Sequence, residues 1–254
     1  MDCYEFELLE SILYDPSKAP NEFYLLEGHI SRLKKSAADF FEDPKYGFFK
    51  ECVNKNQEVF AKNVRSKINQ HVKKYEDDKN NKQRIIRLTV NKDGVIDITD
   101  RLYTPISLEG LKIKLDTKPI DSNNKFLKHK TTNREYYNEA RQRLGLGPTP
   151  GSDDPIFDVL LYNDQNEITE CSSFNIAVQF FDENGTSYWK TPPIECGLLK
   201  GVYRGKLITD EKIIDEKIID EVITVEEIKQ AQRDGRKIKC FDSVMKDFYV
   251  ELEL

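Results

Sequence analysis

Short apolar segments separated by polar turns dominate this chain, and they limit the folds that it can adopt. Turn sequences rich in asparagine, aspartate and glycine occur at residues 91–94, 163–166 and 182–185. Each lies between two apolar segments, and the glycines of the first and third tolerate the backbone conformation that a tight hairpin needs. The chain is therefore expected to be rich in strands that are joined by hairpins.

Helical spacing appears in three places as well. Apolar residues three and four positions apart predict helices over 28–41 and 48–78, and composition predicts a helix over 132–143. Strands are predicted over 4–14, 84–90, 95–98, 111–115, 157–162, 168–181, 237–241 and 248–254. Helices and hairpin-connected strands in one chain indicate an α+β fold.

The segment 119–127 reads as a linker, because it begins with proline and is mostly polar. It divides the chain into a predicted N-terminal lobe, 1–118, and a predicted C-terminal lobe, 128–254. A chain of 254 residues can bury a sizeable core without disulfides or a structural metal.

Charge and cysteine content narrow the class of protein. The formal net charge is −6, from 39 basic and 45 acidic side chains, so a nucleic acid is a poor default partner. No apolar stretch approaches the roughly 20 residues of a membrane-spanning helix. The five cysteines are scattered without a CxxC pair and there are only three histidines, so we expect reduced thiols and no metal site. With an acidic rather than basic N-terminus, this favours a cytoplasmic protein.

Four local features could carry chemistry. Lys130 follows the linker, Arg32 lies on the first predicted helix, and Glu170 follows a hairpin turn. Residues 197–204 form a glycine-bracketed segment whose backbone N–H groups could bind an anion. Each feature alone is ordinary, since most lysines are surface lysines and most loop glycines serve turns.

The order of these features along the chain carries more information than any one of them. They fall in blocks that resemble the class IV (fold type IV) pyridoxal-phosphate enzymes, which include branched-chain and D-amino-acid aminotransferases and 4-amino-4-deoxychorismate lyase. The blocks are residues 9–15, 28–33, 126–134, 160–176, 189–204 and 241–245. The resemblance implies a D-amino-acid aminotransferase-like fold, with a small N-terminal α/β lobe and a larger C-terminal β-rich lobe.

The resemblance also implies a cofactor, pyridoxal 5'-phosphate, and a role for each matching residue. Lys130 would bind the cofactor covalently, and Glu170 would face its pyridine nitrogen. Arg32 and the backbone N–H groups of Val202 and Tyr203 would bind its phosphate. Ser11 stands where lyase members often carry a threonine that relays a proton. The residues predicted to form the active site are therefore Lys130, Ser11, Glu170, Arg32, Val202 and Tyr203.

Two departures from the family pattern bear on the activity. Many aminotransferases have a tyrosine five residues after the lysine, where this chain has Glu135, and Asp242 replaces a usual asparagine. We therefore expect a 4-amino-4-deoxychorismate lyase, which releases 4-aminobenzoate, a folate precursor, and pyruvate. An amino-acid aminotransferase of the branched-chain or D-amino-acid type, and a non-catalytic paralogue, remain as alternatives. A homodimer that acts on a small molecule is expected, because family members place the cofactor near a subunit interface.

Overall fold

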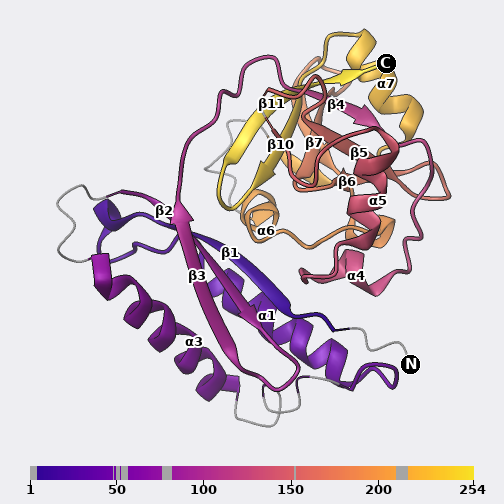
Figure 1. Cartoon of the computed structure of the whole chain (residues 1–254). Coiled ribbons are helices and arrows are strands. Elements are labelled where there is room, and N and C mark those ends of the chain that lie inside the picture. The colour runs from indigo at the N-terminus through magenta and orange to yellow at the C-terminus, as the bar shows by residue number, and fades with distance from the viewer. Residues whose placement is uncertain are drawn as a thin grey trace. The chain divides into compact units, whose positions relative to one another are not determined.

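The computed structural model describes residues 5–47, 49, 52, 57–75, 82–151, 153–209 and 217–254. The chain divides into two units (Figure 1). The first unit contains residues 1–104 together with the short segment 129–133. The second contains residues 105–128 and 134–254.

The first unit is a three-stranded antiparallel sheet with two long helices (Figure 1). In the described residues its elements are β1 (Leu8–Tyr14), the 3-10 turn Pro16–Lys18, α1 (Leu26–Phe41), α3 (Gln57–Val72), the 3-10 turn Lys73–Tyr75, β2 (Arg84–Val90) and β3 (Ile96–Leu102). Strand β2 lies between β1 and β3, with Leu8 opposite Val90 and Val90 opposite Ile96. Helix α1 contacts β1, and α3 contacts both β3 and α1.

Aromatic rings fill much of the core beside α1. Phe6 and Phe40 lie with ring centroids 4.7 Å apart, and the Phe49 ring lies 5.9 Å from that of Phe6. Phe40 and Phe49 are completely buried. Helix α1 adds Ile30 and Leu33, which recur at three-residue spacing and so face the sheet.

The second unit is built on one large, curled sheet (Figure 1). Its described strands are β4 (Lys112–Leu115), β5 (Asp158–Tyr162), β6 (Ile168–Cys171), β7 (Asn175–Phe181), β8 (Ser187–Thr191), β9 (Ile218–Asp220), β10 (Ile238–Asp242) and β11 (Lys246–Glu253). Their order across the sheet is β6-β5-β4-β11-β10-β7-β8-β9. Its helices are α4 (Lys125–Lys128), α5 (Glu135–Arg143), α6 (Val202–Thr209) and α7 (Val225–Arg233), with a 3-10 turn at Ile194–Cys196.

Two apolar clusters hold this sheet and its helices together. One contains inward-facing residues of most strands and of α7, including the mutually packed rings of Phe157, Phe174 and Phe248. The other joins α5 to β5 and includes Tyr137 and Leu161. Helix α5 is therefore fixed on β5, the strand that pairs with β6, and β6 contains Glu170.

The units divide the chain differently from the predicted lobes, 1–118 and 128–254. Residues 105–128 belong to the second unit because β4 pairs with both β11 and β5. The predicted linker 119–127 is part of this unit, and Ile120 forms a bridge to Asn163 within it. Residues 129–133 belong to the first unit because they pair with the start of β1.

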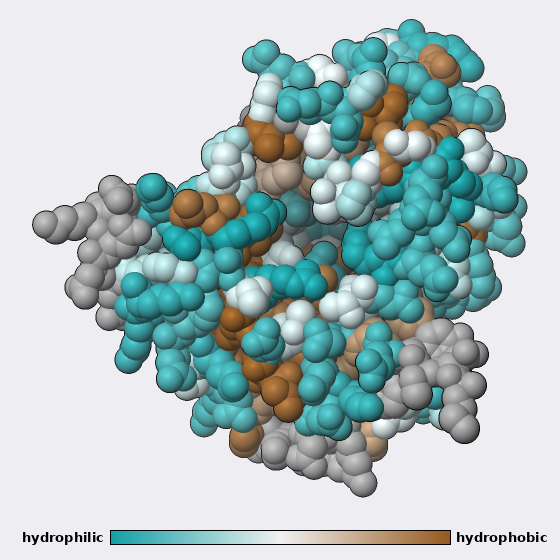
Figure 2. Space-filling model, viewed as in Figure 1, coloured by the Kyte–Doolittle hydropathy of each residue, from teal (hydrophilic) through white to brown (hydrophobic). Residues whose placement is uncertain are grey.

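The surface shown in Figure 2 is mostly hydrophilic, and its apolar side chains occur in small groups. In the described part of the chain, every helix is too short or too polar to span a lipid bilayer.

Candidate active site

Lys130 lies in a short segment that extends the sheet of the first unit beyond β1. The N–H of Leu9 donates to the carbonyl of Lys130 at 2.9 Å, and the N–H of Thr132 donates to the carbonyl of Glu7 at 2.9 Å. Leu8 and Thr131 form an antiparallel bridge. Because side chains alternate between the two faces of paired strands, Lys130 shares its face with Leu9.

Ser11 lies on that same face, two residues after Leu9 in β1. It is half-buried, and its cross-strand neighbour in β2 is Arg87, which is exposed. Opposite residues of an antiparallel pair have Cβ atoms about 5 Å apart. By this register, Lys130, Ser11 and Arg87 belong to one face of the first unit's sheet.

Arg32 belongs to the other face, which α1 covers. Its Nε donates to Oε1 of Glu10 at 2.8 Å, and its Nη2 donates to Oε2 at 2.5 Å. Nδ1 of His29 lies 2.6 Å from the same Oε2. The predicted phosphate ligand Arg32 thus uses its Nε–Nη2 edge to hold a carboxylate of its own unit.

Glu10 is a charged group in the interior of the first unit, only 1% exposed. Burial opposes its ionisation, but Arg32 and His29 outweigh burial and hold its pKa at about 2. Burial lowers the pKa of His29, although Glu10 opposes this shift, and the His29 Nδ1 donates to the ionised carboxylate, which can only accept. The buried Nε2 of His29 has no hydrogen-bond partner among the described residues.

Glu170, at the end of β6, is also buried, and three donors hold its carboxylate. Tyr137 donates its hydroxyl to Oε1 at 2.8 Å, and the N–H of Leu199 donates to the same oxygen at 3.0 Å. Nδ2 of Asn175 donates to Oε2 at 3.0 Å. These donors come from α5, from the loop before α6 and from β7, so three separate elements fix one carboxylate.

The turn that follows Glu170 is held by a second buried ion pair. Nη1 of Arg141 donates to Asp158 at 2.6 Å and to the hydroxyl of Ser172 at 3.2 Å. Arg134 donates to the carbonyl of Ser172 at 2.7 Å. Burial raises the pKa of Asp158, although Ser172 and Arg141 both stabilise its charge.

The glycine-bracketed segment folds tightly against the Glu170 site. A Cβ on Gly201 would lie 1.9 Å from the Oδ1 of Asn175, and Gly197 has a φ of +95°. Helix α6 begins directly afterwards at Val202, and the first N–H groups of a helix have no acceptor within it. The N–H groups of Val202 and Tyr203 are therefore presented at the end of a helix, where an anion is favoured.

Arg204, the next residue, is buried within the second unit. Its Nη2 donates to the carbonyl of Pro192 at 2.7 Å and also pairs with Asp220. Burial lowers its pKa. Because these contacts lie within the second unit, Arg204 stabilises the segment between β8 and α6 that precedes the helix terminus.

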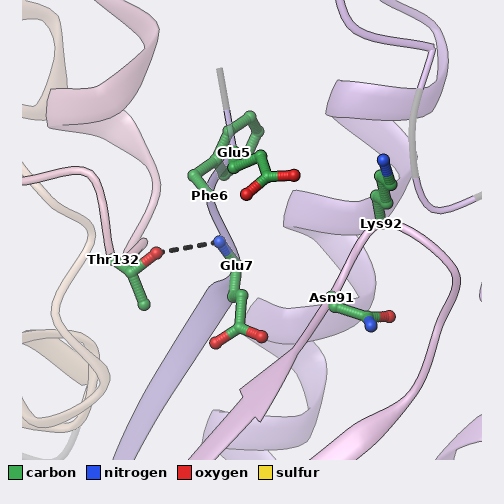
Figure 3. A pocket seen from close by; sticks show the side chains of 6 residues that line it. All are labelled: Glu5, Phe6, Glu7, Asn91, Lys92 and Thr132. Carbon is green, nitrogen blue, oxygen red and sulfur yellow. Dashed lines mark hydrogen bonds between the residues drawn. The ribbon is translucent and has the colours of Figure 1, made fainter. Parts of the chain in front are cut away.

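A hollow of about 430 Å³ lies beside the Lys130 segment in the first unit (Figure 3). Its described lining residues are Glu5, Phe6, Glu7, Asn91, Lys92 and Thr132. The hydroxyl oxygen of Thr132 accepts from the N–H of Glu7 at 2.9 Å, and the Oδ1 of Asn91 accepts from two N–H groups of its own turn. The Thr132 hydroxyl and the Asn91 side-chain oxygen thus accept hydrogen bonds from backbone N–H groups. The residues predicted to form the active site do not line this hollow.

Sequence reasoning missed two residues that hold the site together, Glu10 and Tyr137. Glu10 lies between two pairs of apolar residues in the predicted strand, Leu8-Leu9 and Ile12-Leu13, and a glutamate in that setting signals a buried charge. Tyr137 follows Glu135 by two positions, and its burial and its contact with Glu170 distinguish it from the neighbouring Tyr136. Groups of three or more potential metal ligands do not occur in the described residues.

Comparison with known proteins places these features in a family. The family model of amino-transferase class IV matches residues 7–233. A protein of Schizosaccharomyces pombe (strain 972 / ATCC 24843) named "Putative aminodeoxychorismate lyase" is 29% identical over 211 residues, which cover 82% of this chain and 76% of that protein.

Solved structures share the fold at lower identity. A "Putative amino-acid aminotransferase" from Mesorhizobium loti has a TM-score of 0.71 at 21% identity, covering 98% of this chain and all of that one. A "Putative 4-amino-4-deoxychorismate lyase" from Legionella pneumophila has a TM-score of 0.67 at 17% identity, covering 97% of this chain and 83% of that one. These similarities confirm the predicted fold class.

Proposed function

The chain belongs to the amino-transferase class IV family, and from this premise we propose that it is a 4-amino-4-deoxychorismate lyase. The predicted family is confirmed, so the chain is an enzyme that uses pyridoxal 5'-phosphate and acts on a small molecule. Membership of this family supports an enzyme over the alternative of a non-catalytic paralogue. The relative from Schizosaccharomyces pombe supports the lyase as the specific activity.

The residues present fit the cofactor. A buried carboxylate that three donors hold suits a protonated ring nitrogen, and this carboxylate belongs to Glu170. The packing of Gly201 against Asn175 brings the backbone close to the start of α6, whose N–H groups suit a phosphate. Lys130 supplies the amine. When bound, pyridoxal phosphate withdraws electrons from the substrate carbon next to the amine nitrogen.

The observation that carries the lyase proposal is the shared sheet face of Lys130 and Ser11. In the elimination, the bond between a ring carbon and the ether oxygen breaks and a proton leaves the ring, which becomes aromatic. A proton also reaches the methylene carbon of the departing enolpyruvate, which becomes pyruvate. Lys130 would take the ring proton, and the Ser11 hydroxyl would pass a proton to the departing group.

Arg87 adds a partner for the charge of the substrate. Aminodeoxychorismate carries two carboxylates, and a guanidinium can bind a carboxylate through two parallel hydrogen bonds. Since Arg87 is exposed beside Ser11, we infer that it holds the carboxylate on the side where the proton is transferred.

The same arginine supports the second candidate, an amino-acid aminotransferase. A transaminase must bind a keto acid as well as an amino acid, and Arg87 would serve as a carboxylate clamp for either. The solved structures with this fold include an amino-acid aminotransferase, but at 21% identity this similarity concerns the fold alone.

The test compares the two reactions in one preparation. Pyruvate release from aminodeoxychorismate is measured with a coupled dehydrogenase, beside a panel of branched-chain and D-amino acids with 2-oxoglutarate. We expect pyruvate release to be the faster reaction. Efficient transamination without pyruvate from aminodeoxychorismate would replace the lyase with the aminotransferase.

Ser11→Ala should lower the lyase turnover by about 10²-fold, the scale of a positioned acid or base. Ser11→Thr keeps the hydroxyl and should retain activity, which makes it the matched control. Equal turnover of the alanine variant and the wild type would remove Ser11 from the mechanism.

Lys130→Ala should abolish turnover and the absorption band of a lysine-bound cofactor, while the circular dichroism of the folded chain stays unchanged. Lys128→Ala is the control, because Lys128 is exposed two residues earlier. A Lys130→Ala protein that keeps a borohydride-reducible band would reject this assignment.

A further inference from the structure

Of the three donors to Glu170 described above, Tyr137 is the one that contributes a side chain from a helix. Asn175 lies five residues after Glu170 and also donates to the carbonyl of Leu199, and Leu199 donates its backbone N–H. Tyr137 reaches Glu170 from 33 positions away in sequence, on another element. A buried carboxylate is costly unless donors compensate it, so each donor matters to its charge.

The surroundings of Tyr137 keep its phenol as the donor. The side chain is 7% exposed and packs with Ala140, Val159 and Leu161. Burial, and then the carboxylate of Glu170, raise the pKa of Tyr137 well above its usual value of 10. The phenol therefore stays protonated, and its one proton lies between Tyr137 Oη and Glu170 Oε1, 2.8 Å apart.

The position of the ring is fixed as well. The guanidinium carbon of Arg134 lies 4.7 Å from the ring centroid, and Arg134 donates to the carbonyl of Ser172. At the far end of α5, Arg141 binds Asp158 and Ser172. Helix α5 is thus tied at two points to the turn directly after Glu170, which keeps Tyr137 and Glu170 in one fixed arrangement.

We propose that Tyr137 is a positioning residue of the active site, which keeps Glu170 ionised and in one orientation so that the ring nitrogen of the cofactor stays protonated. This inference rests on the proposed role of Glu170. It does not depend on whether the enzyme is a lyase or an aminotransferase, because either activity requires the same electron-withdrawing ring.

The test uses Tyr137→Phe, which removes the hydroxyl and keeps the ring. Tyr136→Phe is the matched control: it makes the same change at the neighbouring position, whose hydroxyl interacts with Asn124. Each full-length protein is loaded with pyridoxal phosphate labelled with ¹⁵N at the ring nitrogen. The ¹⁵N chemical shift then reports directly whether this nitrogen is protonated.

We expect the wild type and Tyr136→Phe to show the protonated shift, and Tyr137→Phe to move toward the neutral pyridine. In Tyr137→Phe, kcat should fall by roughly 10- to 100-fold, the equilibrium factor for one hydrogen bond to a charged group, while KM changes less. Unchanged ¹⁵N shift and kcat in Tyr137→Phe would overturn the proposal. So would a neutral ring nitrogen in the wild type.

Failure of the proposed function has a different signature. A wild-type protein that transaminates and releases no pyruvate rejects the lyase, yet its ¹⁵N shift still decides the role of Tyr137. Circular dichroism of the cofactor-free variants shows whether each is folded. If Tyr137→Phe does not fold, Tyr137→Leu also removes the hydroxyl, and a protonated ring nitrogen in the folded Tyr137→Leu protein would overturn the proposal.

Discussion

Two residues have a large effect on the geometry of the candidate active site: the buried, charged Glu10 and the tightly packed Gly201. Glu10 has a pKa of about 2 because Arg32 and His29 surround it, in spite of its burial. Because folding lowers the pKa of Glu10, its ionised carboxylate stabilises the folded state. This stabilisation is complete above the unfolded pKa of about 4 and is lost as the pH falls through the folded pKa. Arg32 therefore depends on Glu10 for its position as much as Glu10 depends on Arg32 for its charge.

Gly201 is the residue where the smallest change should have a large effect. In Gly201→Ala the new methyl group would lie 1.9 Å from the Oδ1 of Asn175, so the Asn175 amide must shift, which disturbs its hydrogen bond to Glu170. We expect affinity for pyridoxal phosphate to fall by at least about 10-fold, since one hydrogen bond to a charged group is worth roughly 1.5–3 kcal/mol. Titration of the cofactor-free protein measures this affinity.

Gly205→Ala is the control for that experiment. Gly205 lies in α6, and a Cβ there has no atom within 4 Å. Alanine should therefore leave cofactor affinity unchanged and stabilise the helix by about 0.5–1 kcal/mol. Equal affinities of Gly201→Ala and Gly205→Ala would contradict the tight packing at Asn175.

At the scale of elements, Asp100 joins α3 to the β2–β3 hairpin. Its side chain is 4% exposed and accepts from Arg84 at 2.6 Å, from His71 at 2.7 Å and from the Tyr75 hydroxyl at 2.8 Å. Lys74 adds a fourth donor at 3.1 Å. These partners outweigh burial and hold the pKa of Asp100 far below its usual range.

Asp100→Asn should lower the free energy of unfolding of the first unit by about 3 kcal/mol at pH 7, the lower range for breaking a buried ion pair. Because the folded pKa is depressed, the contribution is complete above the unfolded pKa of about 4 and disappears as the pH falls further. The difference from the wild type in urea unfolding should therefore shrink below about pH 4. Asp97→Asn, at an exposed position of β3, should change little.

Most elements could be predicted from periodicity, but several of their ends and their spatial partners could not. The strand predicted over 84–90 is β2 exactly as bounded, and the helix predicted over 28–41 is α1 from Leu26. The strand predicted over 168–181 is two strands, because the chain turns at 172–174. The helix predicted over 48–78 lies partly outside the described residues, within which α3 spans Gln57–Val72.

The predicted site shows the same division between local and distant information. The helix predicted over 132–143 begins only at Glu135, because Thr132 pairs with Glu7 of the first unit. The sequence motifs supplied Lys130, Glu170 and Arg32, whose chemical roles stay predictions. Arg32 and Glu10 are 22 residues apart in sequence, and Tyr137 and Glu170 are 33 apart. A local sequence pattern cannot predict hydrogen bonds over such separations.

At the scale of the whole molecule, we expect two copies of the chain to associate. Phe181 and Tyr249 of the second unit are 50% and 56% exposed and provide apolar surface for an interface. Sedimentation of the cofactor-loaded protein at micromolar concentration should give the mass of a dimer. A stable monomer over that range would contradict this expectation, and the cytoplasmic location stays a separate prediction.

The pairing of residues 129–133 with the start of β1 sets an order of events during synthesis. Glu7 and Thr132 are 125 positions apart, so the ribosome releases the helices and hairpin of the first unit long before the segment that pairs with β1. Contacts this distant in sequence form late, because a long loop must close first. A nascent chain that stops before residue 129 therefore has an open edge on β1 and no Lys130, and the lysine arrives with the segment that closes that edge.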